Sequence, residues 1–258
     1  MWEKFFITES ESRKAGYGFE MFTAPHFIWL GVLILLGFLI CLAYAKTPAE
    51  KRRRVELTVG LSILGLNLIR AAWLIATGEY DVGYLPLHLC GMSVYIEAFN
   101  AVKPNKLTRE IMFAASMPGA FMALVTPNWN VFPAFSFYIM CCYLLHGLLV
   151  IYPLMLLIGG DFRPTLRRLP LVVLFLVAVS VPVYFFDVRF GRNFMFLRWP
   201  PSGTPLVWFE EWLGNPGYLV GFLVIAAALW LVLYAPFTIA DAVKRRRVLQ
   251  TDTARDTQ

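Results

Sequence analysis

Charge is scarce in this chain of 258 residues: only 16% are Asp, Glu, Lys or Arg, whereas 59% are hydrophobic. A soluble domain usually carries about a quarter charged residues, so too little charge is present to coat one. Cysteine is scarce as well, and the four cysteines lie within long apolar stretches, which gives no disulfide framework. These absences exclude a secreted disulfide scaffold, a disordered chain and an ordinary cytosolic enzyme. They leave a polytopic membrane protein.

Motifs that hold metals or cofactors are missing too. The chain has no CxxC, GxGxxG or HExxH pattern, and its three histidines show no zinc-ligand spacing. We therefore expect no metal and no cofactor. The sequence shows no internal repeat of the kind that builds many transporters, and its last apolar run has no lysine for a Schiff base.

Long apolar runs are what the chain does contain. The hydrocarbon core of a bilayer is about 30 Å thick and needs roughly 20 apolar residues per helix. Seven runs approach that length: 26–45, 55–77, 84–102, 108–126, 133–158, 166–186 and 214–240. The predicted fold class is therefore all-α, a polytopic bundle of seven transmembrane helices. The third and fourth runs are the weakest, because His88, Glu97 and Ser116 interrupt them.

The basic residues give an orientation. Lys and Arg gather in the loops after the first, third and fifth runs and in the C-terminal tail. Because such residues are held on the cytoplasmic side, we expect the N-terminus outside and the C-terminus in the cytoplasm, in the inner (cytoplasmic) membrane. The predicted organisation is an extracytoplasmic segment 1–25, a membrane domain 26–240 and a basic cytoplasmic tail 241–258. We interpret the run Lys244–Arg247 as an orientation signal, so the expected partners are membrane lipids and not nucleic acids.

Ionisable residues inside membrane spans are costly and mark functional sites. Arg70 falls in the second run, His88 and Cys90 in the third, and His146 in the fifth. With the orientation above, these side chains converge on a polar cavity that opens toward the outer leaflet or the midplane. His146, His88 and Cys90 are the candidate catalytic residues, and Arg70 is a candidate substrate-binding residue.

A cysteine or serine nucleophile needs a base within hydrogen-bond reach. At about 100° per residue, His88 and Cys90 would point to nearly opposite faces of one helix. The candidate pairs are therefore His146 with Cys90, or His88 with a thiol or hydroxyl on another helix. Structural roles stay open: a histidine also bonds neighbouring helices, a cysteine packs, and Arg70 also reaches the headgroups by snorkelling.

Residues 187–213, after the sixth run, are amphipathic, aromatic and basic. Non-helical backbone at membrane depth is tolerated where it lines a cavity or packs on protein. We expect a lid over the polar cavity, with Asn193 and Arg192 as candidate substrate-binding residues. An ordinary interfacial loop fits the segment equally well.

Several motifs occur in a characteristic order: Leu85-Pro86-Leu87-His88-Leu89-Cys90, then His146, Asn193–Leu197, Trp199-Pro200-Pro201 and Gly214–Tyr218. In this order they resemble the bacterial YwaF-type family of integral membrane proteins. The chain is also distantly similar to the animal transmembrane protein 164 family. That second resemblance implies an acyltransferase that moves a polyunsaturated acyl chain onto lyso-ether phospholipids, with a cysteine as acyl carrier.

The resemblance places that cysteine between a proline and a histidine, where this sequence has Leu87 between Pro86 and His88. The functional residues that the resemblance implies for this chain are therefore His88 and His146, and the identity of the acyl carrier stays open.

Three functions remain. The first is an intramembrane acyltransferase or lipid hydrolase. In it His146 or His88 is the base, Cys90 or a hydroxyl attacks the ester, and Asn193 or Arg192 holds the phosphate or oxyanion. The second is a small-molecule transporter or solute-binding protein that uses the same cavity. The third is a non-enzymatic membrane scaffold, in which the histidines only pack.

Overall fold

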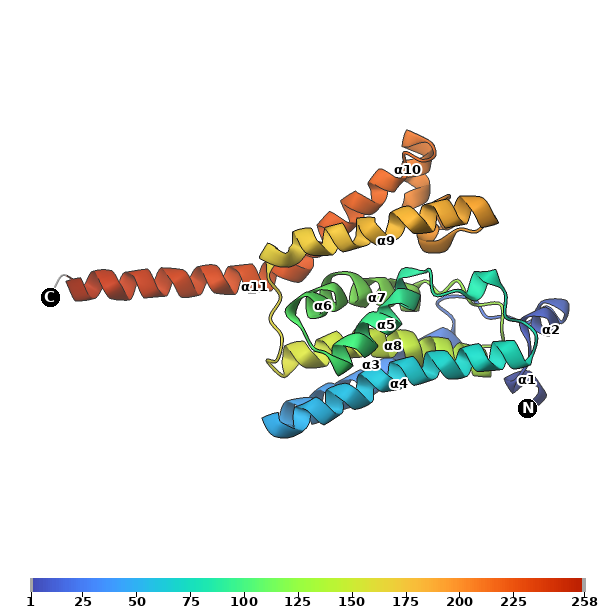
Figure 1. The fold of residues 1–258 in the computed structure, drawn as a ribbon, viewed down its shortest axis with the longest axis horizontal. Coiled ribbons are helices and arrows are strands. Elements are labelled where there is room, and N and C mark those ends of the chain that lie inside the picture. Colours follow the sequence, from blue (N-terminus) through green and yellow to red (C-terminus); the bar gives the residue numbers. More distant parts are fainter. Residues whose placement is uncertain (1, 257–258) are drawn as a thin grey trace. The chain divides into compact units, whose positions relative to one another are not determined.

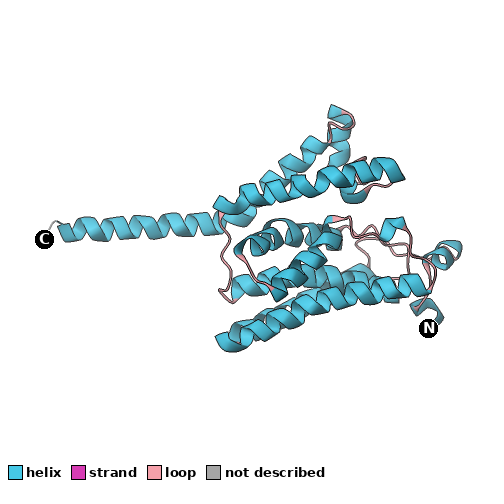
Figure 2. Ribbon diagram, in the orientation of Figure 1, coloured by secondary structure: helices cyan, strands magenta, loops and turns pink. Residues whose placement is uncertain are grey.

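The computed structural model describes residues 2–256, and the side chains of residues 4–244. Figure 2 shows helices and loops throughout that range and no strand. The chain forms two compact units, an N-terminal unit Met1–Phe162 and a C-terminal unit Arg163–Gln258 (Figure 1). The all-α prediction is confirmed.

The N-terminal unit is built around one buried helix. Its elements, in chain order, are α1 (Trp2–Phe5), α2 (Glu9–Lys14), α3 (Ala24–Lys46), α4 (Ala49–Ala76), η1 (Val82–Tyr84), α5 (Leu89–Val102), α6 (Lys106–Ile111), η2 (Met112–Ser116), α7 (Met117–Val125) and α8 (Phe137–Ile158). In the most apolar 18-residue stretch of α8, 72% of the residues are buried, whereas the corresponding fraction is 17% in α3 and 28% in α4. Helices α3, α4 and α7 pack on α8, so α8 is the central helix and the others face outward.

Close helix contacts in this unit depend on glycine. A Cβ at Gly60 of α4 would lie 2.3 Å from the Cβ of Ala101 in α5. A Cβ at Gly147 of α8 would lie 2.5 Å from Leu33 of α3. Small residues let helix backbones approach in a membrane, where the apolar lipid supplies no drive for association.

The C-terminal unit consists of η3 (Leu166–Arg168), α9 (Leu169–Phe190), η4 (Phe194–Phe196), α10 (Leu206–Leu213) and α11 (Leu219–Asp256). The short helix α10 packs on α11, where a Cβ at Gly221 would lie 2.7 Å from the ring of Phe209. Only 11% of the apolar window is buried in each of the two long helices of this unit. The Lys and Arg side chains of the predicted tail beyond Lys244 lie outside the described residues.

Five helices are long and apolar enough to cross a membrane: Ala24–Lys46, Ala49–Ala76, Phe137–Ile158, Leu166–Phe190 and Leu219–Lys244. They confirm the first, second, fifth, sixth and seventh predicted runs as candidate spans. The third run forms the 14-residue helix α5, and the fourth is divided by the π turn η2. The count of seven and the orientation of the termini therefore stay predictions.

The third helix begins later than the sequence suggested. Residues 85–88 are not helical, and α5 starts at Leu89 with His88 as its N-cap. Leu85 has φ −58° and ψ 146°, the extended conformation that a following proline favours. The expectation that His88 and Cys90 lie within one regular helix is therefore wrong, because Pro86 delays the start of the helix.

Candidate functional site

Arg70 is a partly buried cation, and none of the described residues is an acidic partner for it. Its Nη2 donates to Oδ1 of Asn67 at 3.1 Å, and its Nη1 approaches Sγ of Cys142 at 3.9 Å. The guanidinium also lies 5.8 Å from the ring centre of Tyr138. Its Nε is buried and has no hydrogen-bond partner. Among the described residues, no carboxylate lies within ion-pair distance of Arg70.

His146 lies on the central helix next to this cation. It is 8% exposed, and its Nδ1–H donates to the carbonyl oxygen of Cys142 at 2.8 Å. A carbonyl only accepts, so this bond assigns the proton of the neutral ring to Nδ1 and leaves Nε2 as a proton acceptor. The ring stacks on Trp129 with centres 4.5 Å apart. Arg70 and His88 both act on His146 electrostatically.

The structure thus brings Arg70, His146 and His88 into one region of the N-terminal unit. His88 is half-buried at the N-cap of α5. Cys90 is half-buried in the first turn of the same helix. Where side chains are described, no hydrogen bond joins Cys90 to His146. Since catalytic hydrogen bonds often tighten only when substrate binds, the roles of these residues stay predictions.

Cys142 is the thiol that sequence reasoning underrated. It is buried, it receives the Nη1 contact of Arg70, and its carbonyl fixes the ring of His146. The signal was present in the sequence, because Tyr138, Cys142 and His146 follow one another at four-residue steps and so share one helical face.

The N-terminal segment and the loop before α8 cover this end of the unit. Ser12 donates to the carbonyl of Val131 at 2.9 Å, and the N–H of Phe19 donates to the carbonyl of Asn130 at 3.1 Å. The hydroxyl of Tyr84 donates to Glu9. The same loop carries Trp129, the stacking partner of His146. The polar segment 1–25 therefore folds over the end of the bundle that holds Arg70 and His146.

His26 has a structural role. It is fully buried, its Nδ1 accepts from the N–H of Phe22 at 2.9 Å, and its Nε2 donates to the carbonyl of Leu124 at 2.9 Å. Both ring nitrogens are used, so His26 joins the start of α3 to the end of α7 and has no nitrogen left for chemistry.

The predicted lid residues organise their own loop. The Nδ2 of Asn193 donates to the carbonyl of Trp199 at 2.8 Å, and its Oδ1 accepts from the N–H of Arg198 at 2.9 Å. The carbonyl of Arg192 accepts from Nη1 of Arg198 at 3.4 Å. Trp212 and Trp208 are 87% and 70% exposed, as expected of interfacial aromatic residues. Substrate binding by Asn193 and Arg192 stays a prediction.

A second buried polar cluster differs from the Arg70 site because its carboxylate is paired. Oε2 of Glu56 accepts from Nη2 of Arg109 at 3.0 Å, and Oε1 accepts from the hydroxyl of Tyr44 at 3.1 Å. Nearby, Nδ2 of Asn100 donates to the hydroxyl of Tyr152 at 3.0 Å. These bonds tie α3, α4 and α6 together, and α5 to α8, so the cluster has a structural role.

Glu97, which the sequence singled out in the third run, is fully buried on α5. Neither of its carboxyl oxygens has a hydrogen-bond partner, and the same holds for Oγ of Ser116 in η2. Over the described part of the chain, no group of three His, Cys, Asp or Glu side chains has the arrangement of a metal site.

Comparison with known proteins gives one match. A family model described as the TMEM164 family matches residues 21–234. No curated protein and no solved structure matches the chain. The match supports the more distant of the two resemblances drawn from the sequence and leaves the bacterial YwaF-type resemblance a prediction.

Proposed function

The chain belongs to the TMEM164 family, and from that premise we propose that it is an intramembrane enzyme that transfers an acyl chain between phospholipids. The observation that carries the proposal is the guanidinium of Arg70, which is partly buried, contacts Cys142 beside His146 and has no carboxylate partner among the described residues.

A buried charge without a counter-ion costs several kcal/mol, and within a membrane such a residue marks a functional site. The missing partner of an arginine is an anion, and the planar guanidinium fits a phosphate through two parallel hydrogen bonds. A phospholipid headgroup supplies a phosphate at the edge of the membrane. We therefore assign Arg70 to binding the substrate phosphate.

His146 supplies the base in this proposal. Its Nε2 takes the proton of the free hydroxyl of a lysophospholipid, and the hydroxyl oxygen attacks the acyl carbonyl of the donor phospholipid. A new ester bond forms as the carbon–oxygen bond of the donor ester breaks. His146 then returns the proton to the departing oxygen, so a second lysophospholipid leaves. General acid–base catalysis of this kind contributes about 10²–10⁴-fold to a rate.

Cys90 and Cys142 are the candidates for an acyl carrier, if the transfer passes through a thioester. The thiol would then attack the donor ester first, and the lysophospholipid hydroxyl would attack the thioester in a second step. Cys142 contacts Arg70 directly, whereas Cys90 follows His88 by two residues in the motif that carries the family resemblance.

The test uses the purified full-length protein in liposomes with a labelled lysophospholipid and a labelled acyl donor, followed by lipid mass spectrometry. Wild type is compared with Arg70→Gln, His146→Ala, Cys90→Ala and Cys142→Ala. Arg54→Gln is the matched control, because Arg54 is an exposed arginine on the same helix as Arg70. Size-exclusion profiles confirm that each variant is folded.

We expect label to move with wild type and Arg54→Gln, and His146→Ala to lower turnover by roughly 10²–10⁴-fold. Arg70→Gln should raise the KM for lysophospholipid more than it lowers kcat. Loss of turnover in Cys90→Ala or Cys142→Ala identifies the carrier, and retention in both indicates direct transfer. Transfer that survives His146→Ala, or its absence from folded wild type with every donor pair, refutes the proposal.

A further inference from the structure

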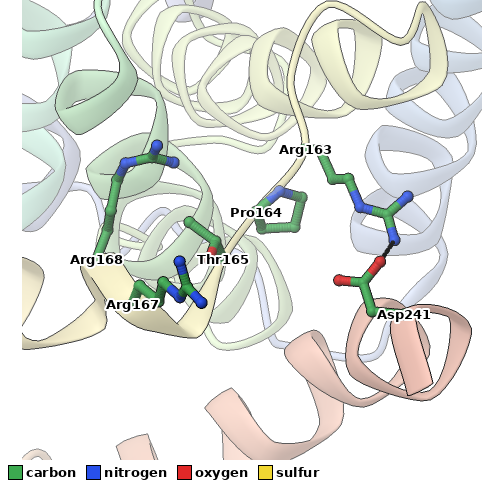
Figure 3. Close-up of a pocket in the computed structure, with 6 residues that line it drawn as sticks. All are labelled: Arg163, Pro164, Thr165, Arg167, Arg168 and Asp241. Atoms are coloured by element: carbon green, nitrogen blue, oxygen red, sulfur yellow. Dashed lines mark hydrogen bonds and ion pairs between the residues drawn. The ribbon is translucent and has the colours of Figure 1, made fainter. Parts of the chain in front are cut away.

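A pocket in the C-terminal unit is lined mainly by arginines and lies outside the site described above. It encloses about 350 Å³ and is lined by Arg163, Pro164, Thr165, Arg167, Arg168 and Asp241. Figure 3 shows Arg163 directed at Asp241 of α11, while Arg167 and Arg168 come from η3 at the start of α9.

The pocket carries more positive than negative charge. Arg163 and Asp241 form an ion pair at 2.5 Å, with both side chains more than half exposed. That pair neutralises Arg163, and Arg167 adds a positive charge to the pocket. Arg167 is exposed and makes no hydrogen bond or ion pair within the described part of the chain. A guanidinium group in a concave site is suited to a phosphate.

The position of the pocket indicates where that phosphate comes from. Arg167 and Arg168 lie in the first turn of the candidate span Leu166–Phe190, and Asp241 lies three residues before the end of the candidate span Leu219–Lys244. The pocket is thus at the ends of two candidate membrane helices, where headgroups are found. Along α9 the apolar side chains of Leu171 and Leu174 are 46% and 63% exposed. Acyl chains attached to a phosphate in the pocket would cover these side chains.

We propose that this pocket binds the phosphate of an anionic phospholipid headgroup, with Arg167 as its ligand and the Arg163–Asp241 pair as its wall. Basic pockets between membrane helices recognise anionic lipids in this way. The site is separate from the proposed acyl-transfer site, because its residues belong to η3, the preceding loop and α11.

Asp241 gives the proposal a directional test. The carboxylate neutralises Arg163 and repels a phosphate, so Asp241→Asn should release Arg163 and strengthen binding. Arg167→Gln should weaken it, because one basic residue near a membrane surface changes affinity for anionic lipid roughly fivefold. Arg189→Gln is the matched control, since Arg189 is an exposed arginine at the other end of α9.

The measurement is native mass spectrometry of the full-length protein in a neutral maltoside detergent. The probes are dioctanoyl phosphatidylglycerol, dioctanoyl phosphatidylcholine and inorganic phosphate. Every variant is also made with Arg70→Gln, which removes the phosphate ligand of the proposed acyl-transfer site and keeps the two sites distinguishable. We expect phosphatidylglycerol to bind more tightly than phosphatidylcholine, Arg167→Gln to weaken it, Asp241→Asn to tighten it and Arg189→Gln to leave it unchanged.

Three results would overturn the proposal. Equal affinity for the two lipids would show that the positive charge is not used. Unchanged binding in both Arg167→Gln and Asp241→Asn would show that these side chains do not bind lipid. The arginines would then serve only to orient the protein in the membrane. Displacement of phosphatidylglycerol by an equal concentration of inorganic phosphate would make the pocket a site for a soluble anion.

Discussion

Replacing Arg70 by glutamine should stabilise the protein while it weakens the binding of lysophospholipid. Most buried charges are paired, and removing one partner of such a pair destabilises the fold. Arg70 differs because no described carboxylate pairs with it and its buried Nε has no hydrogen-bond partner. The unpaired charge of Arg70 therefore lowers the stability of the folded protein. This loss is offset only when a phosphate occupies the site.

The magnitude follows from the contacts of Arg70. Arg70→Gln removes the desolvation cost of one ion, which is several kcal/mol. It keeps an N–H donor three residues from Asn67, so the bond at 3.1 Å is replaced by a neutral one, a loss of about 1 kcal/mol. The cation–π contact with Tyr138, 5.8 Å from the ring centre, is lost at a cost of about 0.5–2 kcal/mol. The net change is an increase of about 1–3 kcal/mol in the free energy of unfolding. It corresponds to a Tm that is higher by roughly 2–10 °C.

Thermal unfolding is followed in neutral detergent without added lipid and again with phosphatidylglycerol. Lipid should raise the Tm of wild type, because a ligand that binds the folded state stabilises it, and should raise the Tm of Arg70→Gln less. Arg54→Gln, on the exposed side of α4, should change stability by no more than about 0.5 kcal/mol. A clear fall in the Tm of lipid-free Arg70→Gln would refute the reasoning and make Arg70 a structural residue.

Three further predictions concern the fold of the N-terminal unit. Glu56→Ala should destabilise this unit by about 3–5 kcal/mol, because Arg109, with a side chain only 15% exposed, loses its ion-pair partner. Denaturant unfolding measures the change. The control Glu50→Ala, at an exposed position, should leave stability nearly unchanged. Gly60→Ala should cost about 1–3 kcal/mol, because its Cβ would lie 2.3 Å from that of Ala101; Gly65→Ala on the same helix meets no atom within 4 Å and should not destabilise. Hydrogen bonds from the N–H and hydroxyl of Thr8 lower the pKa of Glu11, so the charged form stabilises the start of α2 above the unfolded pKa. That contribution is lost as pH falls through the lowered folded value; the protection of the α2 amides against exchange should then fall in wild type and stay unchanged in Glu11→Ala.

The sequence was sufficient to predict the helices whose apolar runs are uninterrupted. Runs 26–45 and 133–158 became α3 and α8, because about 20 apolar residues in lipid have no alternative to a helix. The same argument failed at 84–102. There Pro86 constrains Leu85 to an extended conformation, and Gly91 lets the backbone of Pro86 approach to within 2.8 Å of where a Cβ would be. Hydropathy does not report such local backbone preferences.

The candidate site was predictable in its residue types and not in its pairings. Arg70 and His146 stood out in the sequence because ionisable residues within membrane spans are costly. The stacking of Trp129 on His146 could not be predicted, because Trp129 lies in a loop whose position depends on bonds from Ser12 and Phe19 far away in the sequence. The role of Cys142 was missed because its thiol contacts a residue 72 positions earlier, which helical spacing within α8 cannot reveal.

The two buried polar clusters of the N-terminal unit show why pairing, rather than burial, separates structure from function. Glu56 pairs with Arg109 of α6 and with Arg53 of its own helix, so this carboxylate needs no further cation, and its removal leaves Arg109 without an ion-pair partner. Arg70 has an amide, a thiol and an aromatic face around it, and none of these neutralises its charge. A phosphate would do so. In the proposed function, the lipid that carries this phosphate would also present its hydroxyl to His146, whose Nδ1 proton is held by the carbonyl of Cys142.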